Sequence, residues 1–286
     1  MTSAIAVPTI SPSMKRSILM FLCACAVGAA EPVELRFEKL QSIEGSAKWD
    51  WWQVRTAFVP GKKPMWITTM SETGKGSSHD FHDIYQSTSR DGGRNWSKPS
   101  AIAALKRTKQ TDGYEVAPGD LWPTFHAKSG MVLTTGKTFN FADGKRENRL
   151  REKVSYAVLN PKIGAWGSMR FLAMPAKDHS GATIIGANAG CTQRVDLPNG
   201  DILLPVRYWR DPKQHNYTSV VVRCAFDGKT LIYKKHGSEH NLPQGRGLYE
   251  PSLTKFDGQY FLTMRANHSA FVTRSKDGIH FEPIRE

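Results

Sequence analysis

The chain has 286 residues and a mass of 31.9 kDa, and its 40% hydrophobic and 23% charged residues exclude an intrinsically disordered protein. The 24 glycines, 16 prolines and 8 tryptophans favour short strands joined by tight turns over long helical bundles. The 39 Lys and Arg residues against 26 Asp and Glu leave a net charge of +13. This charge favours acidic partners, whether an anionic sugar, a sulfated glycan, a membrane surface or nucleic acid.

Residues 1–30 have the pattern of a signal peptide. Lys15 and Arg16 precede an apolar stretch that ends in small residues, and Met14 is a possible start. The stretch is too short to span a bilayer, and a buried N-terminal helix is the alternative interpretation. Cleavage leaves residues 31–286 with a charge of +11 and predicts a secreted or periplasmic protein, with lipid anchoring at Cys25 as a minor alternative.

Two cysteines, Cys191 and Cys224, remain after this cleavage, enough for one disulfide at most. Neither lies in a metal-ligand spacing. His79 and His82 form a His-x-x-His pair, but no third or fourth ligand is spaced to join them, so no metal site is expected.

A repeat of two strands around a glycine turn, followed later by an Asp/Asn-containing turn, occurs four times. The glycines are spaced by 69, 70 and 58 residues, and the second landmark follows each of them. The glycines are Gly61, Gly130, Gly200 and Gly258, and the second landmarks are Asp91, Asn160, Asp227 and Asp277. Units of this length predict an all-β propeller in which blades stack around a channel, with a β-sandwich as the alternative.

The segment Ser89–Trp96 matches the S-x-D-x-G-x-x-W pattern of an Asp-box through Ser89, Asp91, Gly93 and Trp96. The Ser and Asp oxygens are expected to accept backbone N–H groups of the turn, the glycine to take a positive φ, and the aromatic ring to fill the space between sheets. A version one residue shorter contains Ser275, Asp277, Gly278 and Phe281. These residues are predicted to be structural.

With this Asp-box and repeat, residues 45–286 resemble the sialidase (neuraminidase) family. The resemblance implies a six-bladed β-propeller, of which this chain holds about four blades, and an N-terminal strand around Glu34–Leu40. The family continues after the position of Arg265 with two more blades that bring a third arginine and a nucleophilic tyrosine, whereas this sequence ends 21 residues later. The propeller is therefore expected to be incomplete at its C-terminus, and this chain alone to be inactive or poorly folded.

The resemblance also implies a site for a sugar carboxylate. Arginine suits this task because its planar fork binds carboxylates bidentately. Arg55 and Arg265 match the family's first and second arginines, and Arg207 is the reserve candidate in the preceding unit. Asp80 matches the acid/base, and Glu250 matches the glutamate that polarises the missing tyrosine.

Three functions follow as alternatives: a retaining exo-α-sialidase, a hydrolase or lyase of another anionic polysaccharide, and a carbohydrate-binding propeller without catalysis. No cofactor is expected, because Gly74–Gly76 lacks the rest of a nucleotide-binding fingerprint. Nucleic acid is an improbable partner because the basic residues are dispersed over the repeats. Nothing in the sequence indicates the oligomeric state.

Overall fold

The computed structural model of the protein describes residues 34–77, 79–147 and 149–286. The predicted signal segment, with Met14 and Cys25, lies outside the described residues. The chain divides into two units, Met1–Lys39 and Leu40–Glu286. In the part of the chain that is described, no helix is long and apolar enough to cross a membrane.

The predicted N-terminal strand around Glu34–Leu40 is not a strand. These residues have no regular secondary structure, and Leu35 and Phe37 are 72% and 90% exposed. The side chains of Arg36 and Glu34 form a local ion pair within this stretch. A strand needs backbone partners along its length, and the described residues supply none to this stretch.

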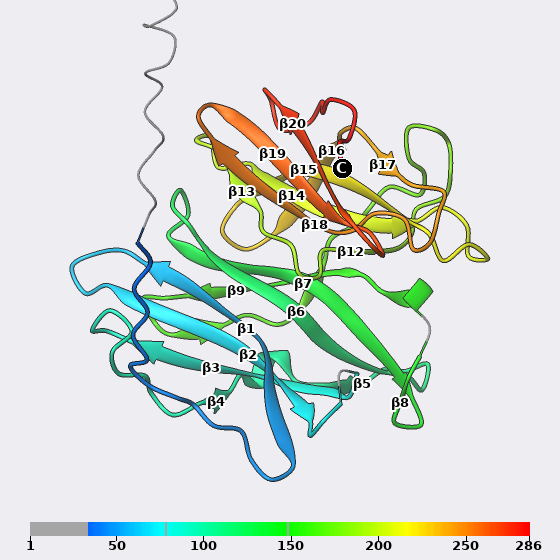
Figure 1. Ribbon diagram of the computed structural model, residues 1–286. Helices are drawn as coiled ribbons and strands as arrows, with labels where there is room; N and C mark the ends of the chain where they lie inside the picture. The colour runs from blue at the N-terminus through cyan, green and yellow to red at the C-terminus, as the bar shows by residue number, and fades with distance from the viewer. Residues whose placement is uncertain (1–33, 78, 148) are drawn as a thin grey trace, which may run out of the picture. The chain divides into compact units, whose positions relative to one another are not determined.

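Leu40–Glu286 contains four antiparallel sheets that follow one another along the chain (Figure 1). The first consists of β1 (Trp49–Val59), β2 (Met65–Gly74), β3 (Phe81–Ser89) and β4 (Ser100–Ala101). The second consists of β5 (Thr108–Lys109), β6 (Glu115–His126), β7 (Met131–Ala142), β8 (Lys145–Arg146), β9 (Val154–Asn160), β10 (Ala165–Trp166) and β11 (Arg170–Phe171).

The third sheet consists of β12 (Ile185–Asn188), β13 (Val195–Asp196), β14 (Ile202–Trp209), β15 (Tyr217–Phe226), β16 (Leu231–His236) and β17 (His240–Asn241), and the fourth of β18 (Tyr249–Phe256), β19 (Gln259–Arg265) and β20 (Ala270–Ser275). Two short 3-10 turns, Ala103–Leu105 and Arg149–Arg151, lie outside the sheets.

Each predicted repeat corresponds to one sheet. The four glycines lie between the first and second long strands of their sheets, and each has a positive φ, from 70° at Gly130 to 140° at Gly61. The second landmarks lie at or just after the end of the third long strand. The prediction of an all-β chain with about four propeller blades is therefore confirmed.

The blades are joined by apolar seams. Consecutive side chains of a strand point to opposite faces, so one strand can serve two seams. In β7, Val132 packs with the first blade while Leu133 packs with the third. In β14, Leu203 packs with the fourth blade while Leu204 packs with the second. All four side chains are fully buried, which explains the adjacent apolar residues at these positions of β7 and β14.

The two Asp-boxes form the hydrogen bonds expected of the motif. Asp91 Oδ1 accepts the N–H of Asn95 at 2.9 Å, and Ser89 Oγ accepts that of Gly93 at 3.0 Å. These bonds hold the pKa of Asp91 at about 2. Trp96 donates its indole N–H back to the carbonyl of Gly93 at 2.9 Å.

The shorter Asp-box repeats this arrangement. Asp277 Oδ1 accepts the N–H groups of Ile279 and His280 at 2.9 and 2.8 Å, and Ser275 Oγ accepts that of Gly278 at 2.9 Å. Phe281 packs against the seam between the third and fourth blades.

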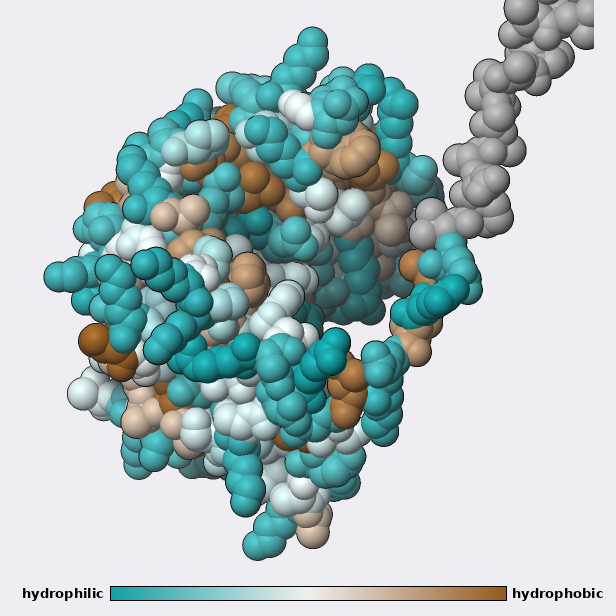
Figure 2. Space-filling view, turned by 90° about the vertical axis from the view of Figure 1, so that its left-hand side faces the viewer, coloured by the Kyte–Doolittle hydropathy of each residue, from teal (hydrophilic) through white to brown (hydrophobic). Residues whose placement is uncertain are grey.

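The side on which β1 and β3 end is mainly hydrophilic, with hydrophobic residues scattered over it, and it is hollowed between its upper and lower halves (Figure 2). Phe58 and Trp66, at the turn between β1 and β2, are 43% and 36% exposed, and their rings contact each other at a tilt of 45° with centroids 4.9 Å apart. The first Asp-box follows β3 on this side. The polar cluster described next lies instead at the middle of the first strands.

Candidate functional site

The first strand of each blade is interrupted by one residue with a left-handed backbone. Its φ is 56° at Gln53, 52° at Asp120, 61° at Cys191 and 53° at Glu250. The strand register shifts at Gln53, Asp120 and Glu250, which makes each of them a β-bulge. Non-glycine residues rarely adopt this conformation, and such strain is concentrated at functional sites. We call these four the bulge residues.

A second set of side chains lies across from the bulge residues on the second strands. Ser71, Lys137 and Arg265 pair with the residue directly before the bulge in their blade, and Arg207 pairs with Asn188 in the third blade. Each blade thus contributes one bulge residue and one cross-strand partner. Three of the four partners are cationic.

Gln53 and Asp120 connect the first two blades. Gln53 Oε1 accepts hydrogen bonds from the backbone N–H of Asp120 at 2.5 Å and from Ser71 Oγ at 3.1 Å, while its amide nitrogen donates to the Asp120 carboxylate. The other carboxylate oxygen of Asp120 lies 2.9 Å from Lys137 Nζ, and these two side chains are only 6% and 8% exposed. Asp120 is therefore held on both oxygens.

Asp120 is ionised in spite of its burial. Burial by itself raises the pKa of this carboxyl, but the charge and hydrogen bond of Lys137, together with the charge of Arg207, bring the pKa below its ordinary value. Because Asp120 holds no proton near neutral pH, it is suited to orient Lys137 and Gln53 and not to act as a general acid.

Glu250 lies between two arginines. Arg265 Nη1 donates to Glu250 Oε2 at 3.0 Å, and Arg207 Nη1 lies 3.7 Å from Glu250 Oε1. The side chain of Arg265 is 60% exposed, whereas that of Arg207 is 4% exposed. Tyr217 and Tyr249 contribute ring faces at 5.1 Å from the guanidinium carbons of Arg207 and Arg265 respectively.

Arg207 has unused donors. Its Nε and Nη1 atoms are buried and have no hydrogen-bond partner among the described residues. A buried guanidinium without hydrogen bonds is costly, so a buried donor of this kind is normally satisfied by another group or by a ligand. An oxyanion bound here could accept hydrogen bonds from these two unused donors.

Cys191 lies beside Asp120. Its backbone N–H donates to the carbonyl of Asp120 at 3.4 Å. Burial, followed by the charge of Asp120 and to a smaller extent that of Glu250, raises the pKa of the Cys191 thiol to about 12. The thiol is therefore neutral, and Cys191 and Cys224 are both free cysteines and not a disulfide. Lys137, Arg207 and Arg265 outnumber Asp120 and Glu250, so the cluster carries one surplus positive charge.

The predicted residues Arg207, Arg265 and Glu250 are thus brought together. Arg55 is not a bulge residue but lies two positions after one; its guanidinium lies over the ring of Trp122 at 4.8 Å and donates to the carbonyl of Val54. In the first blade the bulge position, which Glu250 occupies in the fourth, belongs to Gln53.

Asp80 lies in the turn between β2 and β3. Its carboxylate is 2.9 Å from His82 Nε2 and 3.7 Å from Arg107 Nη1, and it is 43% exposed. The polar partners of Glu250 are Arg207 and Arg265, so Asp80 lies outside that ion-pair group.

Sequence reasoning missed Gln53, Asp120 and Lys137. The usable signal was the spacing: the bulge residues are 67, 71 and 59 residues apart, close to the 69, 70 and 58 of the turn glycines. The same spacing applied to the first two blades leads to Gln53 and Asp120.

No protein-family model and no curated protein sequence matches the chain. Among solved structures, Trypanosoma rangeli sialidase in complex with sialic acid matches with a TM-score of 0.58 at 14% identity, over 80% of this chain and 37% of that one. The Hadza microbial sialidase Hz136 matches with a TM-score of 0.54 at 13% identity, over 79% and 45%. The GH43 β1,3-galactosidase BT3683 matches with a TM-score of 0.50 at 12% identity, over 80% and 75%.

These likenesses show the fold. The chain has the propeller fold of sialidases and other glycoside hydrolases. It spans 37% of the length of the Trypanosoma rangeli sialidase and 45% of that of Hz136. Identities of 12 to 14% do not carry an activity from those proteins to this one.

Proposed function

We propose that the protein is an exo-acting glycoside hydrolase of the sialidase type that removes a terminal sugar bearing a carboxylate from a glycan. The observation that carries this proposal is Arg207, a buried guanidinium whose Nε and Nη1 have no hydrogen-bond partner among the described residues. A sugar carboxylate supplies the missing acceptors, and the surplus positive charge of the cluster supplies the attraction.

In this proposal Arg207 and Arg265 hold the sugar carboxylate. Glu250 now accepts from Arg265 and lies near Arg207, so it keeps both guanidinium groups in place until the substrate arrives. In the mechanism that the resemblance implies, Glu250 accepts the proton of a tyrosine hydroxyl that attacks the anomeric carbon, and Asp80 gives a proton to the leaving oxygen; that tyrosine has no match in this sequence. Asp120 and Lys137 form an ion pair in the second blade. In this proposal the pair stabilises the site and takes no part in proton transfer.

Two other functions remain in competition. A hydrolase or lyase of another anionic polysaccharide would use the same cationic cluster for a uronic acid. A binding propeller would use it without turnover. The export expected from residues 1–30 would bring the protein to extracellular glycans in all three cases, and it stays a prediction.

The test combines turnover with binding. The full chain is incubated with a fluorogenic sialoside, with sialyl-lactose and with the corresponding neutral galactoside, and free sialic acid and free glucuronic acid are titrated by calorimetry. The variant Arg207→Met removes the guanidinium with the two unused donors at similar length. Arg274→Met is the matched control, because Arg274 is an exposed arginine paired with Glu282 beside the second Asp-box.

We expect binding of sialic acid, lost in Arg207→Met and kept in Arg274→Met. Release of sialic acid is expected to be slow or absent, because the nucleophilic tyrosine that the resemblance implies has no match in this sequence. Appreciable release would overturn that expectation and favour the hydrolase over the binding propeller. A preference for glucuronic acid supports the second alternative. Equal binding of the neutral sugar, or unchanged binding by Arg207→Met, contradicts the role given to the cluster.

A further inference from the structure

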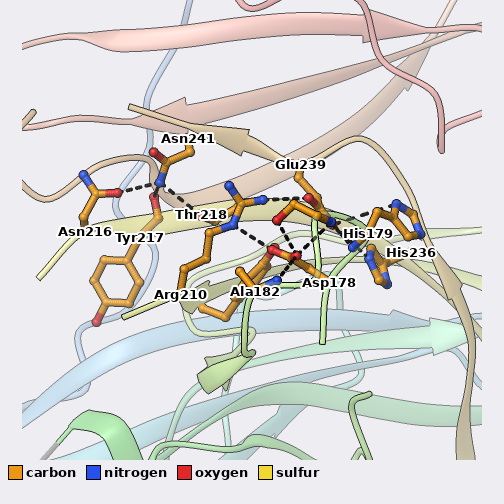
Figure 3. Close-up of polar contacts among 12 residues, drawn as sticks. Asp178, His179, Ala182, Arg210, Asn216, Tyr217, Thr218, His236, Glu239 and Asn241 are labelled. Atoms are coloured by element: carbon orange, nitrogen blue, oxygen red, sulfur yellow. Dashed lines mark hydrogen bonds and ion pairs between the residues drawn. The ribbon is translucent and has the colours of Figure 1, made fainter. Parts of the chain in front are cut away.

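A second polar cluster lies in the third blade and shares no residue with the site above. It joins the turn Lys177–Thr183, which is closed by a bridge between these two residues, to the end of β16 and the connection to β17 (Figure 3). Three of its side chains, His179, His236 and Glu239, bring their ligand-type atoms within 4.8 Å of one another.

The distances within this triad suit a metal ion. His236 Nε2 is 3.1 Å and His179 Nδ1 is 3.8 Å from the same carboxylate oxygen, Glu239 Oε1. Two ligands bound to zinc at about 2.0–2.1 Å in tetrahedral geometry lie about 3.3 Å apart. The observed separations bracket that value, so an ion can be placed with little movement of Glu239 and His236.

Neighbouring side chains hold the two buried ligands in orientation. Tyr233 Oη lies 2.7 Å from His236 Nδ1, which leaves Nε2 directed at Glu239. Arg210 donates to Glu239 Oε2 at 2.6 Å, while Oε1 faces the two imidazoles and also accepts the backbone N–H of His179 at 2.7 Å. Arg210 is itself held by Asp178 at 2.7 Å. Outer partners of this kind fix the ring and carboxylate orientation in metal sites.

His179 is the adjustable member. Its ring stacks on that of His236 with centroids 3.9 Å apart and an interplanar angle of 18°. Two stacked rings cannot both direct a nitrogen lone pair at one ion, so His179 must turn when the ion binds. Its side chain is 63% exposed, whereas those of His236 and Glu239 are 4% and 10% exposed, so this rotation meets little resistance.

We propose that His179, His236 and Glu239 bind a divalent transition metal ion, with zinc as the best fit to two imidazoles and one carboxylate. Three protein ligands leave the fourth position to water. The ion fastens the turn around His179 to the β16–β17 connection, because its ligands come from both segments. The site serves the stability of the third blade and stands independently of the glycan proposal.

The probe is Zn²⁺ alone, added to the full chain after treatment with a chelator and dialysis. Calorimetry with a competing chelator gives affinity and stoichiometry, and thermal unfolding gives the linked stabilisation. Co²⁺ in place of Zn²⁺ gives a visible spectrum that reports tetrahedral coordination. The main variant is His179→Ala, because an exposed side chain can be removed without unfolding the blade. The matched control is His268→Ala, an exposed histidine in the turn between β19 and β20.

We expect one Zn²⁺ per chain, a rise in melting temperature with Zn²⁺, and an affinity at least about 10-fold weaker in His179→Ala than in His268→Ala. Glu239→Gln should lose the cobalt spectrum. The proposal is overturned if the wild-type chain binds no Zn²⁺, or if His179→Ala binds it as tightly as the wild type. Replacement of the buried His236 can prevent folding, so the decisive comparison is the one between His179→Ala and His268→Ala.

Discussion

Lys137 and Asp120 form a buried ion pair across two strands of the second blade, with Nζ and Oδ2 2.9 Å apart. Asp120 is also the bulge residue of that blade, so the ion pair holds a strained backbone position. The pair lies directly beside Cys191 and Gly190; a Cβ on Gly190 would come within 2.8 Å of both the Asp120 carboxylate and the Lys137 side chain.

Removing one partner of this pair should be costly. Lys137→Met leaves Asp120 buried without its cation, and we expect a loss of about 3–5 kcal/mol in the free energy of unfolding. Urea denaturation measures it. Asp120→Asn should cost a similar amount, and the double variant should cost clearly less than the sum of the two. Strictly additive losses would contradict the coupling.

Arg207 should lower the stability of the ligand-free protein while it enables anion binding. Its replacement by methionine removes a buried guanidinium with unused donors, and Glu250 retains Arg265 at 3.0 Å. We expect Arg207→Met to be more stable than the wild type by about 1–2 kcal/mol in the absence of ligand, while anion binding is lost. Denaturation with and without sialic acid checks both effects. A destabilised variant would show that Arg207 is satisfied within the protein.

Gly278→Ala should destabilise the protein strongly. It has a φ of 75°, and a Cβ there would lie 2.4 Å from Leu203 Cδ1 in the seam between the third and fourth blades. Gly92→Ala is the matched control, because Gly92 has a φ of 76° with nothing within 4 Å of its Cβ position. We expect a loss of about 1 kcal/mol at Gly92 from the backbone alone, and a clearly larger loss at Gly278. Equal melting temperatures would exclude a tight seam.

The free energy of unfolding should fall as the pH drops from about 4 to about 2, in part because Asp201 becomes protonated. Burial tends to raise the pKa of Asp201, but hydrogen bonds from Lys234, Arg223 and Asn199 lower it to about 2. A carboxyl whose folded pKa is depressed adds stability that is complete above its unfolded pKa of about 3.9 and is lost as the pH falls through the folded pKa.

Asp201→Asn tests this relation. The variant should be less stable than the wild type at pH 7, and the difference should shrink between about pH 4 and pH 2. Urea denaturation across that range measures the difference. A pH-independent difference would assign the loss to packing and not to charge.

Cys191 and Cys224 should be unreactive in the folded protein. Burial is the first cause that raises the pKa of the Cys191 and Cys224 thiols, to about 12 in each case. The thiolate is the reactive form, so alkylation at pH 8 should be slow in buffer and fast in urea. Mass spectrometry counts the modified thiols. Rapid modification of Cys191 in the native protein would show that the centre of the cluster is open to reagents.

The short-range features of this protein follow from the sequence by itself. A tight turn is decided by a few adjacent residues, so the glycine turns and the Asp-box Ser89–Trp96 could be read from their residue types. Their regular spacing then predicted four successive blades. The pairing of Glu250 with Arg265 can also be predicted from the sequence, because one hairpin brings together residues that lie 15 apart in the chain.

Contacts between blades were decided by the tertiary structure alone. Gln53 meets Asp120 across 67 residues, and Arg207 approaches Glu250 across 43, because radial packing brings the first strands toward one axis. The sequence marks neither which strand position bulges nor which donor of Arg207 is left unused. Those properties depend on how neighbouring sheets pack. Burial in turn sets the energetic cost of an ion pair or of a donor without a hydrogen bond.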